Sequence, residues 1–148
     1  MLVYRNGRLY CGKVSFKLPN EICIDTSNNE TCENGIHLCA PDKSFIVQID
    51  FRETGRNAYE EISHYFKGQL SYLLIGEIEE VSTGGLCGYK AKYEDKRTIN
   101  EEYIFNITNS RKSTLLDIYI MIKKSSITYD EGYKNRIVAE ILDGIESN

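Results

Sequence analysis

Residues 115–122 read Leu-Leu-Asp-Ile-Tyr-Ile-Met-Ile, and this stretch decides the architecture of the chain. In an extended strand alternate side chains point to opposite faces, so the even-numbered positions form one wholly aliphatic face. The odd-numbered face also carries large apolar side chains, at Leu115, Tyr119 and Met121. A strand with one face in water would alternate apolar with polar residues. The stretch therefore predicts a central strand of a sheet, with other structure packed against each face.

Period-two patterns before this stretch predict the rest of the sheet. The first runs over residues 9–18. A register that sets Leu18 opposite Ile22 keeps the apolar residues on one face, so we expect a three-residue hairpin loop at Pro19-Asn20-Glu21. Residues 26–35 carry no large apolar side chain and predict a surface loop. Further strands are predicted over residues 36–39, 44–52, 73–81, 86–93 and 99–107.

Two helices are predicted, each opening with a capping box. Asn57 with Glu60 begins the first helix, and Thr128 with Glu131 begins the second. Apolar residues then recur at helical spacing. They are Ala58, Ile62, Tyr65, Phe66 and Leu70 in the first helix, and Tyr133, Ile137, Val138, Ile141, Leu142 and Ile145 in the second.

The order of these elements predicts the fold class. Consecutive strands that are joined by tight turns pair in antiparallel fashion. We therefore expect a single domain over residues 1–148 of the α+β class, in which an antiparallel β-sheet is flanked by two helices.

The 148 residues carry a net charge of −4, and 41% of them are hydrophobic. This composition is typical of a globular domain and argues against a nucleic-acid binder, which normally presents a basic face. No run of about 18 apolar residues occurs, and the N-terminus has no apolar run of signal-peptide length. We therefore expect a cytoplasmic protein without a membrane span. The five cysteines, an odd number, then favour reduced thiols over a disulfide framework.

Two histidines, His37 and His64, are available as general bases. His64 falls off the apolar stripe of the first helix and is expected at its surface or boundary. His37 shares a strand face with Cys39, so a thiol-dependent enzyme or a redox sensor using this pair is one alternative. Cys32, His37 and Cys39 lack the paired spacing of a structural zinc site, and we expect no metal or other cofactor.

Two further motifs favour structural roles. The stretch Gly84-Gly85-Leu86-Cys87-Gly88 lies between two predicted strands, whereas a phosphate-binding loop leads into a helix. Its first two glycines indicate a hairpin turn.

Glu101 and Glu102 lie on the strand after the one with Lys90 and Lys92, which predicts charge pairs across a solvent-exposed face. No carboxylate lies in an apolar setting that would raise its pKa. The sequence thus predicts no catalytic constellation, and we expect no enzymatic activity.

Tyrosine is the unusual feature of the composition, because the chain has eleven tyrosines and no tryptophan. Tyrosine is favoured at contact surfaces, since it buries a large area and keeps a polar tip, but it is also a normal sheet residue. We hypothesise a protein-binding surface at Tyr89, Tyr93 and Tyr103, with plain sheet packing as the alternative. A small-molecule pocket between sheet and helix is a third alternative.

Several segments together resemble the PsbP-like family of small α/β/α sandwich domains over about residues 12–146. They are the opening 14–20, the strand end 48–51, the capped first helix, the glycine-containing meander and the terminal helix. The resemblance implies non-enzymatic work, since members include a photosystem accessory subunit, a partner of a nuclear-transport GTPase and chaperone-like adaptors. No functional residue of the family is recognisable here. We therefore expect a protein-binding or adaptor domain with a protein partner.

Overall fold

The computed structural model describes residues 3–11, 14–24, 35–67, 73–107 and 113–147, and its central strand is β11 (Ser113–Lys123). Strand β11 pairs in antiparallel fashion with β6 (Phe45–Thr54) on one side and with β10 (Thr98–Ile107) on the other. Its Leu115 and Leu116 point to opposite faces, and both are fully buried. The central position predicted for residues 115–122 is therefore confirmed.

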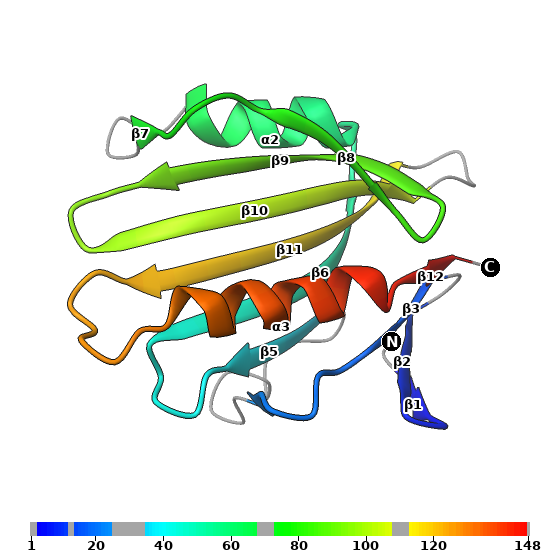
Figure 1. The fold of residues 1–148 in the computed structure, drawn as a ribbon. Coiled ribbons are helices and arrows are strands. Elements are labelled where there is room, and N and C mark those ends of the chain that lie inside the picture. Colours follow the sequence, from blue (N-terminus) through cyan, green and yellow to red (C-terminus); the bar gives the residue numbers. More distant parts are fainter. Residues whose placement is uncertain (1–2, 12–13, 25–34, 68–72, 108–112, 148) are drawn as a thin grey trace.

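The other strands extend the sheet on both sides of this centre (Figure 1). Beyond β6 lie β5 (Gly35–Cys39) and the short edge strand β4 (Cys23–Ile24). Beyond β10 lies β9 (Leu86–Glu94), whose outer side pairs with β7 (Leu73–Leu74) and β8 (Glu79–Thr83). All these pairings are antiparallel. The predicted hairpin turn at Gly84-Gly85 is confirmed, because both glycines have positive φ and Thr83 pairs with Leu86.

The two helices lie on opposite faces of this sheet (Figure 1). Helix α3 (Glu131–Asp143) packs Ile137 and Ile141 into the larger core. Helix α2 (Ala58–Lys67) packs Ala58 and Ile62 into a smaller cluster with residues of β9, β10 and β11. The predicted α+β class is thus confirmed. Asn57 caps α2 as expected, since its Oδ1 accepts from the Glu60 amide at 2.9 Å.

Helix α3 begins two residues later than the sequence predicted. Its cap is Asp130, whose Oδ1 accepts from the Tyr133 amide at 3.1 Å, and not Thr128. The carboxylate of Asp130 is a stronger acceptor than the Thr128 hydroxyl, which instead lies 3.3 Å from the Ser126 hydroxyl. His64 of α2 is exposed, which agrees with the sequence-based expectation.

A second, smaller antiparallel sheet lies beside the C-terminal end of α3 and corrects the sequence-based interpretation of residues 9–24 (Figure 1). It contains β1 (Val3–Arg5), β2 (Arg8–Cys11), β3 (Val14–Lys17) and β12 (Glu146–Ser147). The expected single strand over residues 9–18 is two strands that pair with each other.

The expected hairpin between residue 18 and residue 22 is also wrong. Strand β3 pairs with β2 and β12, whereas β4 pairs with β5 of the larger sheet. Between them the chain crosses from one sheet to the other, and α3 holds the crossing. The Tyr133 hydroxyl donates to the Glu21 carbonyl at 2.6 Å, and Arg136 forms an ion pair with the Glu21 carboxylate.

We predict that Gly88→Ala destabilises the fold by about 1–3 kcal/mol, the usual range for overpacking. A Cβ atom at Gly88 would lie 2.1 Å from the carbonyl oxygen of Ile104, so β9 and β10 would have to separate. The free energy of unfolding, measured by urea denaturation, tests this. Gly55→Ala is the matched control, because a Cβ atom there meets nothing within 4 Å. Equal stability of the two variants would contradict the packing argument.

Candidate functional site

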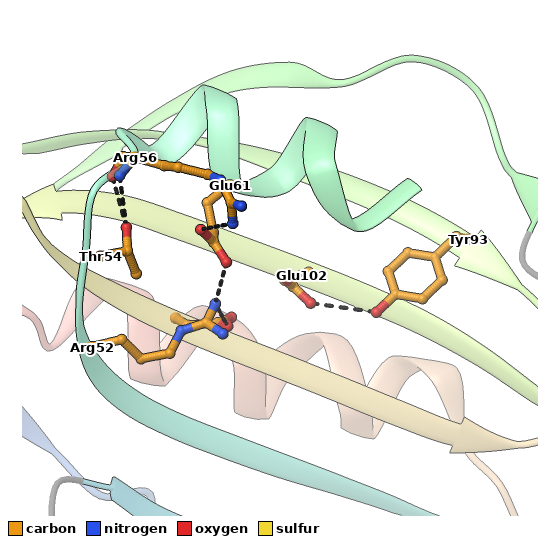
Figure 2. Close-up of polar contacts among 7 residues, drawn as sticks. Arg52, Thr54, Arg56, Glu61, Tyr93 and Glu102 are labelled. Carbon is orange, nitrogen blue, oxygen red and sulfur yellow. Dashed lines mark hydrogen bonds and ion pairs between the residues drawn. The ribbon is translucent and has the colours of Figure 1, made fainter. Parts of the chain in front are cut away.

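A cluster of charged side chains lies beneath α2, between the helix and the sheet (Figure 2). We call it the buried charge cluster: its carboxyl groups, Glu61, Glu102 and Asp117, are buried, and its guanidinium groups, those of Arg52 and Arg56, are partly exposed. The guanidinium of Arg52 contacts Asp117 at 2.6 Å and Glu61 at 3.7 Å. Arg56 contacts Glu61 at 3.4 Å. Strands β6 and β11 and helix α2 are therefore joined by ion pairs at this point.

Burial gives two carboxyl groups of this cluster unusual acidity. It raises the pKa of Glu102 to about 8, with the charge of Asp117 adding to the effect. Burial also raises the pKa of Asp117 to about 7, against the opposing attraction of Arg52. One oxygen of each carboxyl, Oε1 of Glu102 and Oδ1 of Asp117, has no hydrogen-bond partner among the described residues. The Tyr93 hydroxyl donates to the other oxygen of Glu102 at 3.3 Å.

The expectation that no carboxylate would have a raised pKa is therefore wrong. Glu101 lies on the same face of the sheet as Lys90 and Lys92, because the register places it directly opposite Lys92. Its carboxylate accepts two bonds from the buried Lys134 ammonium, at 2.7 and 2.9 Å. Glu102 points the other way, under α2. The alternation of side chains along β10 places the two glutamates on opposite faces of the sheet. Glu102 is desolvated because α2 covers its face.

A different surface lies at the edge of the sheet that β7 and β8 form. Leu73, Leu74 and Ile75 are 69%, 41% and 38% exposed, so three consecutive large aliphatic side chains face solvent. Within the described residues no further strand pairs with the outer side of this edge. The segment then continues with Glu77, Glu79 and Glu80, and residues 73–83 contain no basic side chain. We call this surface the β7–β8 edge.

A bulge interrupts the β7–β8 edge, so the single strand predicted over residues 73–81 is in fact two. The Ile75 amide donates to the Lys92 carbonyl at 2.7 Å, and regular pairing resumes where Glu79 meets Lys90. Residues 76–78 therefore oppose Ala91 alone, and Gly76 supplies the positive φ that the bulge requires. A pocket of about 210 Å³ opens here, lined by Ile75, Gly76, Glu77, Glu79, Lys90, Ala91, Lys92, Glu101 and Tyr103.

The three tyrosines predicted to form an interface do not share one surface. Tyr103 lines the bulge pocket, on the α3 side of the sheet. Tyr93 is 1% exposed and lies beneath α2, so the prediction that it is an exposed binding residue is wrong. Tyr89 lies on the same side as Tyr93, where its ring packs edge-on against Tyr59 with centroids 5.1 Å apart. Alternation along β9 and β10 places Tyr89 and Tyr103 on opposite faces.

The residues proposed for thiol chemistry lie at the other end of the sheet. His37 and Cys39 are half-buried on the same side of β5. Cys39 lies directly opposite Cys23 of β4. Cys32, the third residue weighed for zinc, lies outside the described residues. In the described part of the chain, no group of three or more His, Cys, Asp or Glu side chains is placed to hold a metal ion.

Comparison with known proteins supports the fold described above. No family model and no curated protein sequence matches the chain. The solved structure of a point mutant of the protein Mog1 is similar, with a TM-score of 0.55 and 11% sequence identity over 93% of this chain and 92% of that one. The chain thus has a Mog1/PsbP-like fold, as the sequence resemblance implied. At this identity the likeness concerns the fold alone.

A second similar structure comes from Bacteroides thetaiotaomicron VPI-5482, with a TM-score of 0.48 and 13% identity. It covers 92% of this chain but only 45% of that chain, so this chain spans less than half of its length. Among the helices of the described residues, none is long and apolar enough to cross a membrane.

We predict that the buried carboxyl groups make the stability of the protein fall as pH rises from about 4.5 to about 8. The folded state holds the proton of Glu102 more tightly than the unfolded state, so the contribution of this group to stability is fully present below the unfolded pKa of 4.5 and is lost as pH rises towards the folded pKa of about 8. Each unit of pKa difference corresponds to about 1.4 kcal/mol. Urea denaturation at several pH values measures the slope.

Glu102→Gln should reduce this pH dependence, because an amide keeps the shape of the protonated acid and cannot ionise. Glu80→Gln is the matched control, since Glu80 is exposed on β8. The control should retain the slope of the unmodified protein. The same slope in Glu102→Gln would show that Glu102 is not the titrating group.

Proposed function

We propose that this chain is a non-enzymatic protein-binding domain of the adaptor or chaperone type and that its partner binds at the β7–β8 edge. The observation that carries the proposal is the exposure of Leu73, Leu74 and Ile75 on an edge without a strand partner in the described residues. The Mog1-like fold is consistent with such a role.

An exposed sheet edge usually carries protection against pairing with other chains. Lysines, prolines, bulges or covering loops provide this protection in most proteins. At the β7–β8 edge the bulge at residues 76–78 and the following glutamates protect the second half. The first half, Leu73 to Ile75, has neither charge nor proline. Aliphatic side chains at such a place favour contact with a partner, because burying them releases water from apolar surface.

The geometry favours a partner in extended conformation. An added strand would form main-chain hydrogen bonds with the outer side of β7, which is the mode of strand addition. Its side chains would then alternate between the two faces of the sheet. On the α3 side they meet the bulge pocket, whose volume of about 210 Å³ lies below the roughly 300–1,000 Å³ of small-molecule sites. The pocket therefore suits one side chain of a partner better than a separate ligand.

The charge of the edge selects the partner further. Glu77, Glu79 and Glu80 are all exposed, and Lys90, at 3.2 Å, neutralises Glu79 alone. Two carboxylates therefore stay unneutralised by described residues along the second half of the edge. A partner segment with apolar residues followed by basic ones would complement this order.

We predict that Leu73→Lys weakens capture of the natural partner by about tenfold or more, since it places an ammonium group in the apolar part of the interface. The measurement is capture by the tagged protein from a lysate of its own organism after crosslinking, with quantitative mass spectrometry. Leu73 is 69% exposed, so the fold should tolerate the change. Ile127→Lys is the matched control, because Ile127 is a 99% exposed aliphatic residue in the turn before α3. Equal loss in both variants, or capture of nothing, would contradict the proposal.

The charge preference is tested separately with two synthetic octapeptides. One alternates valine with lysine and the other alternates valine with glutamate. We predict that the lysine peptide binds about tenfold more tightly at low salt and that added salt reduces the difference. The double reversal Glu77→Lys with Glu80→Lys should invert the preference, whereas Glu140→Lys on the exposed side of α3 should not. Fluorescence anisotropy measures both affinities. An unchanged preference in the double variant would exclude the edge as the peptide site.

A further inference from the structure

Two cysteines face each other across the edge of the sheet that lies opposite to the β7–β8 edge. Strand β4 pairs with β5 in antiparallel fashion, and the register sets Cys23 directly against Cys39. Directly opposed residues of an antiparallel pair have Cα atoms about 4.5–5.5 Å apart, and their side chains leave the same face. A disulfide spans Cα separations of about 4.4–6.8 Å. The Cα separation expected from this register is therefore within the range that a disulfide spans.

The two thiols differ in their access to solvent. Cys23 is exposed on a strand of two residues, whereas Cys39 is half-buried on a strand that has partners on both sides. A small reagent in solution therefore reaches Cys23 first. Cys39 is close enough to attack Cys23 afterwards, because the strand register holds the two residues together.

We propose that Cys23 and Cys39 form a redox-active pair that closes a cross-strand disulfide by exchange with a low-molecular-weight disulfide. The Cys23 thiolate attacks one sulfur of the small disulfide, forms a mixed disulfide and releases the first small thiolate. The Cys39 thiolate then attacks Sγ of Cys23 and releases the second. Both protons end on the released thiols. The pair loses two electrons, and the small disulfide gains them.

The geometry makes this disulfide a reversible one. The Cβ atoms of directly opposed residues lie about 4.5–5.5 Å apart, whereas a disulfide holds them near 3.8 Å. Strands β4 and β5 must therefore approach by about 1 Å at this pair. Strained and exposed disulfides have more oxidising potentials and are reduced more readily than structural ones. A small excess of reduced thiol should therefore reopen the bond.

Closing the bond would fix β4 to the sheet. In the thiol form β4 is held by two residue pairs, Cys23 with Cys39 and Ile24 with Leu38. The preceding crossing is held at Glu21 by Tyr133 and Arg136 of α3. A covalent link at Cys23 adds a second fixed point two residues after Glu21, so the end of the crossing segment that enters the large sheet is held twice. The pair thus modifies the edge that does not carry the proposed partner site.

The test treats the full chain with oxidised glutathione, blocks the remaining thiols by alkylation and maps the peptides by mass spectrometry. The expected product is a peptide pair joined through Cys23 and Cys39, lighter than the two thiols by two hydrogen atoms. Cys87 is an internal control, since it is exposed but faces Asn106 and Ser82. It should stop at the mixed disulfide with glutathione.

Variants separate the two steps. In Cys39→Ser the mixed disulfide at Cys23 should accumulate to the level seen at Cys87, and Cys87→Ser should leave the cross-strand product unchanged. Two results would overturn the proposal. One is a lasting mixed disulfide at Cys23 in the unmodified protein while Cys39 stays open to alkylation. The other is a link from either residue to a different cysteine. Both readouts are independent of partner binding at the β7–β8 edge.

Discussion

The burial of both faces of β11 is the constraint on which the rest of the structure depends. Its Leu116, Ile118 and Ile120 are buried on the side of α3, and Leu115 is buried on the side of α2. An apolar strand of this kind is stable only where neighbouring strands satisfy its peptide groups and other layers cover both faces. The long partners β6 and β10 meet the first need. The two helices meet the second from opposite sides, and this produces the three-layer arrangement (Figure 1).

The apolar clusters on the two faces of the sheet differ in size, and the buried charge cluster lies on the face with the smaller one. The α3 side has a continuous core of aliphatic and aromatic residues, whereas the apolar cluster on the α2 side is smaller and, among the described side chains of the helix, contains Ala58 and Ile62. Charged groups also lie on the α2 side, where Arg52 of β6 forms ion pairs with Asp117 of β11 and with Glu61 of α2 (Figure 2). A buried ion pair adds little net stability over an apolar contact, but removing one member leaves a charge without compensation. Removing one member of the cluster should therefore cost more stability than the intact cluster adds.

An open sheet has two edges, and in this protein the two edges differ in chemistry. The β7–β8 edge combines exposed aliphatic residues with glutamates and a bulge pocket, which suits an extended, partly basic partner. The β4 edge is a strand of two residues with a cysteine facing Cys39. Neither edge is closed by a further strand of the described residues. Each edge is therefore accessible to a partner or reagent. The side chains along the edge determine which kind of molecule can bind or react there.

Local patterns by themselves determined the central strand, both helices, the glycine turn and the α+β class. These features depend on periods of two and 3.6 residues, which neighbouring residues specify. Tertiary structure alone decided how the strands before residue 25 pair. The alternation in residues 9–18 is real, yet β3 joins a different sheet from β4, because a period of two sets the faces of a strand and not its partner. The same limit applies to Tyr93 and Glu102. The sequence shows which face of β9 and β10 each side chain occupies. Only the packing of α2 excludes water from one of these faces. That packing involves residues distant in the sequence, which no local pattern contains.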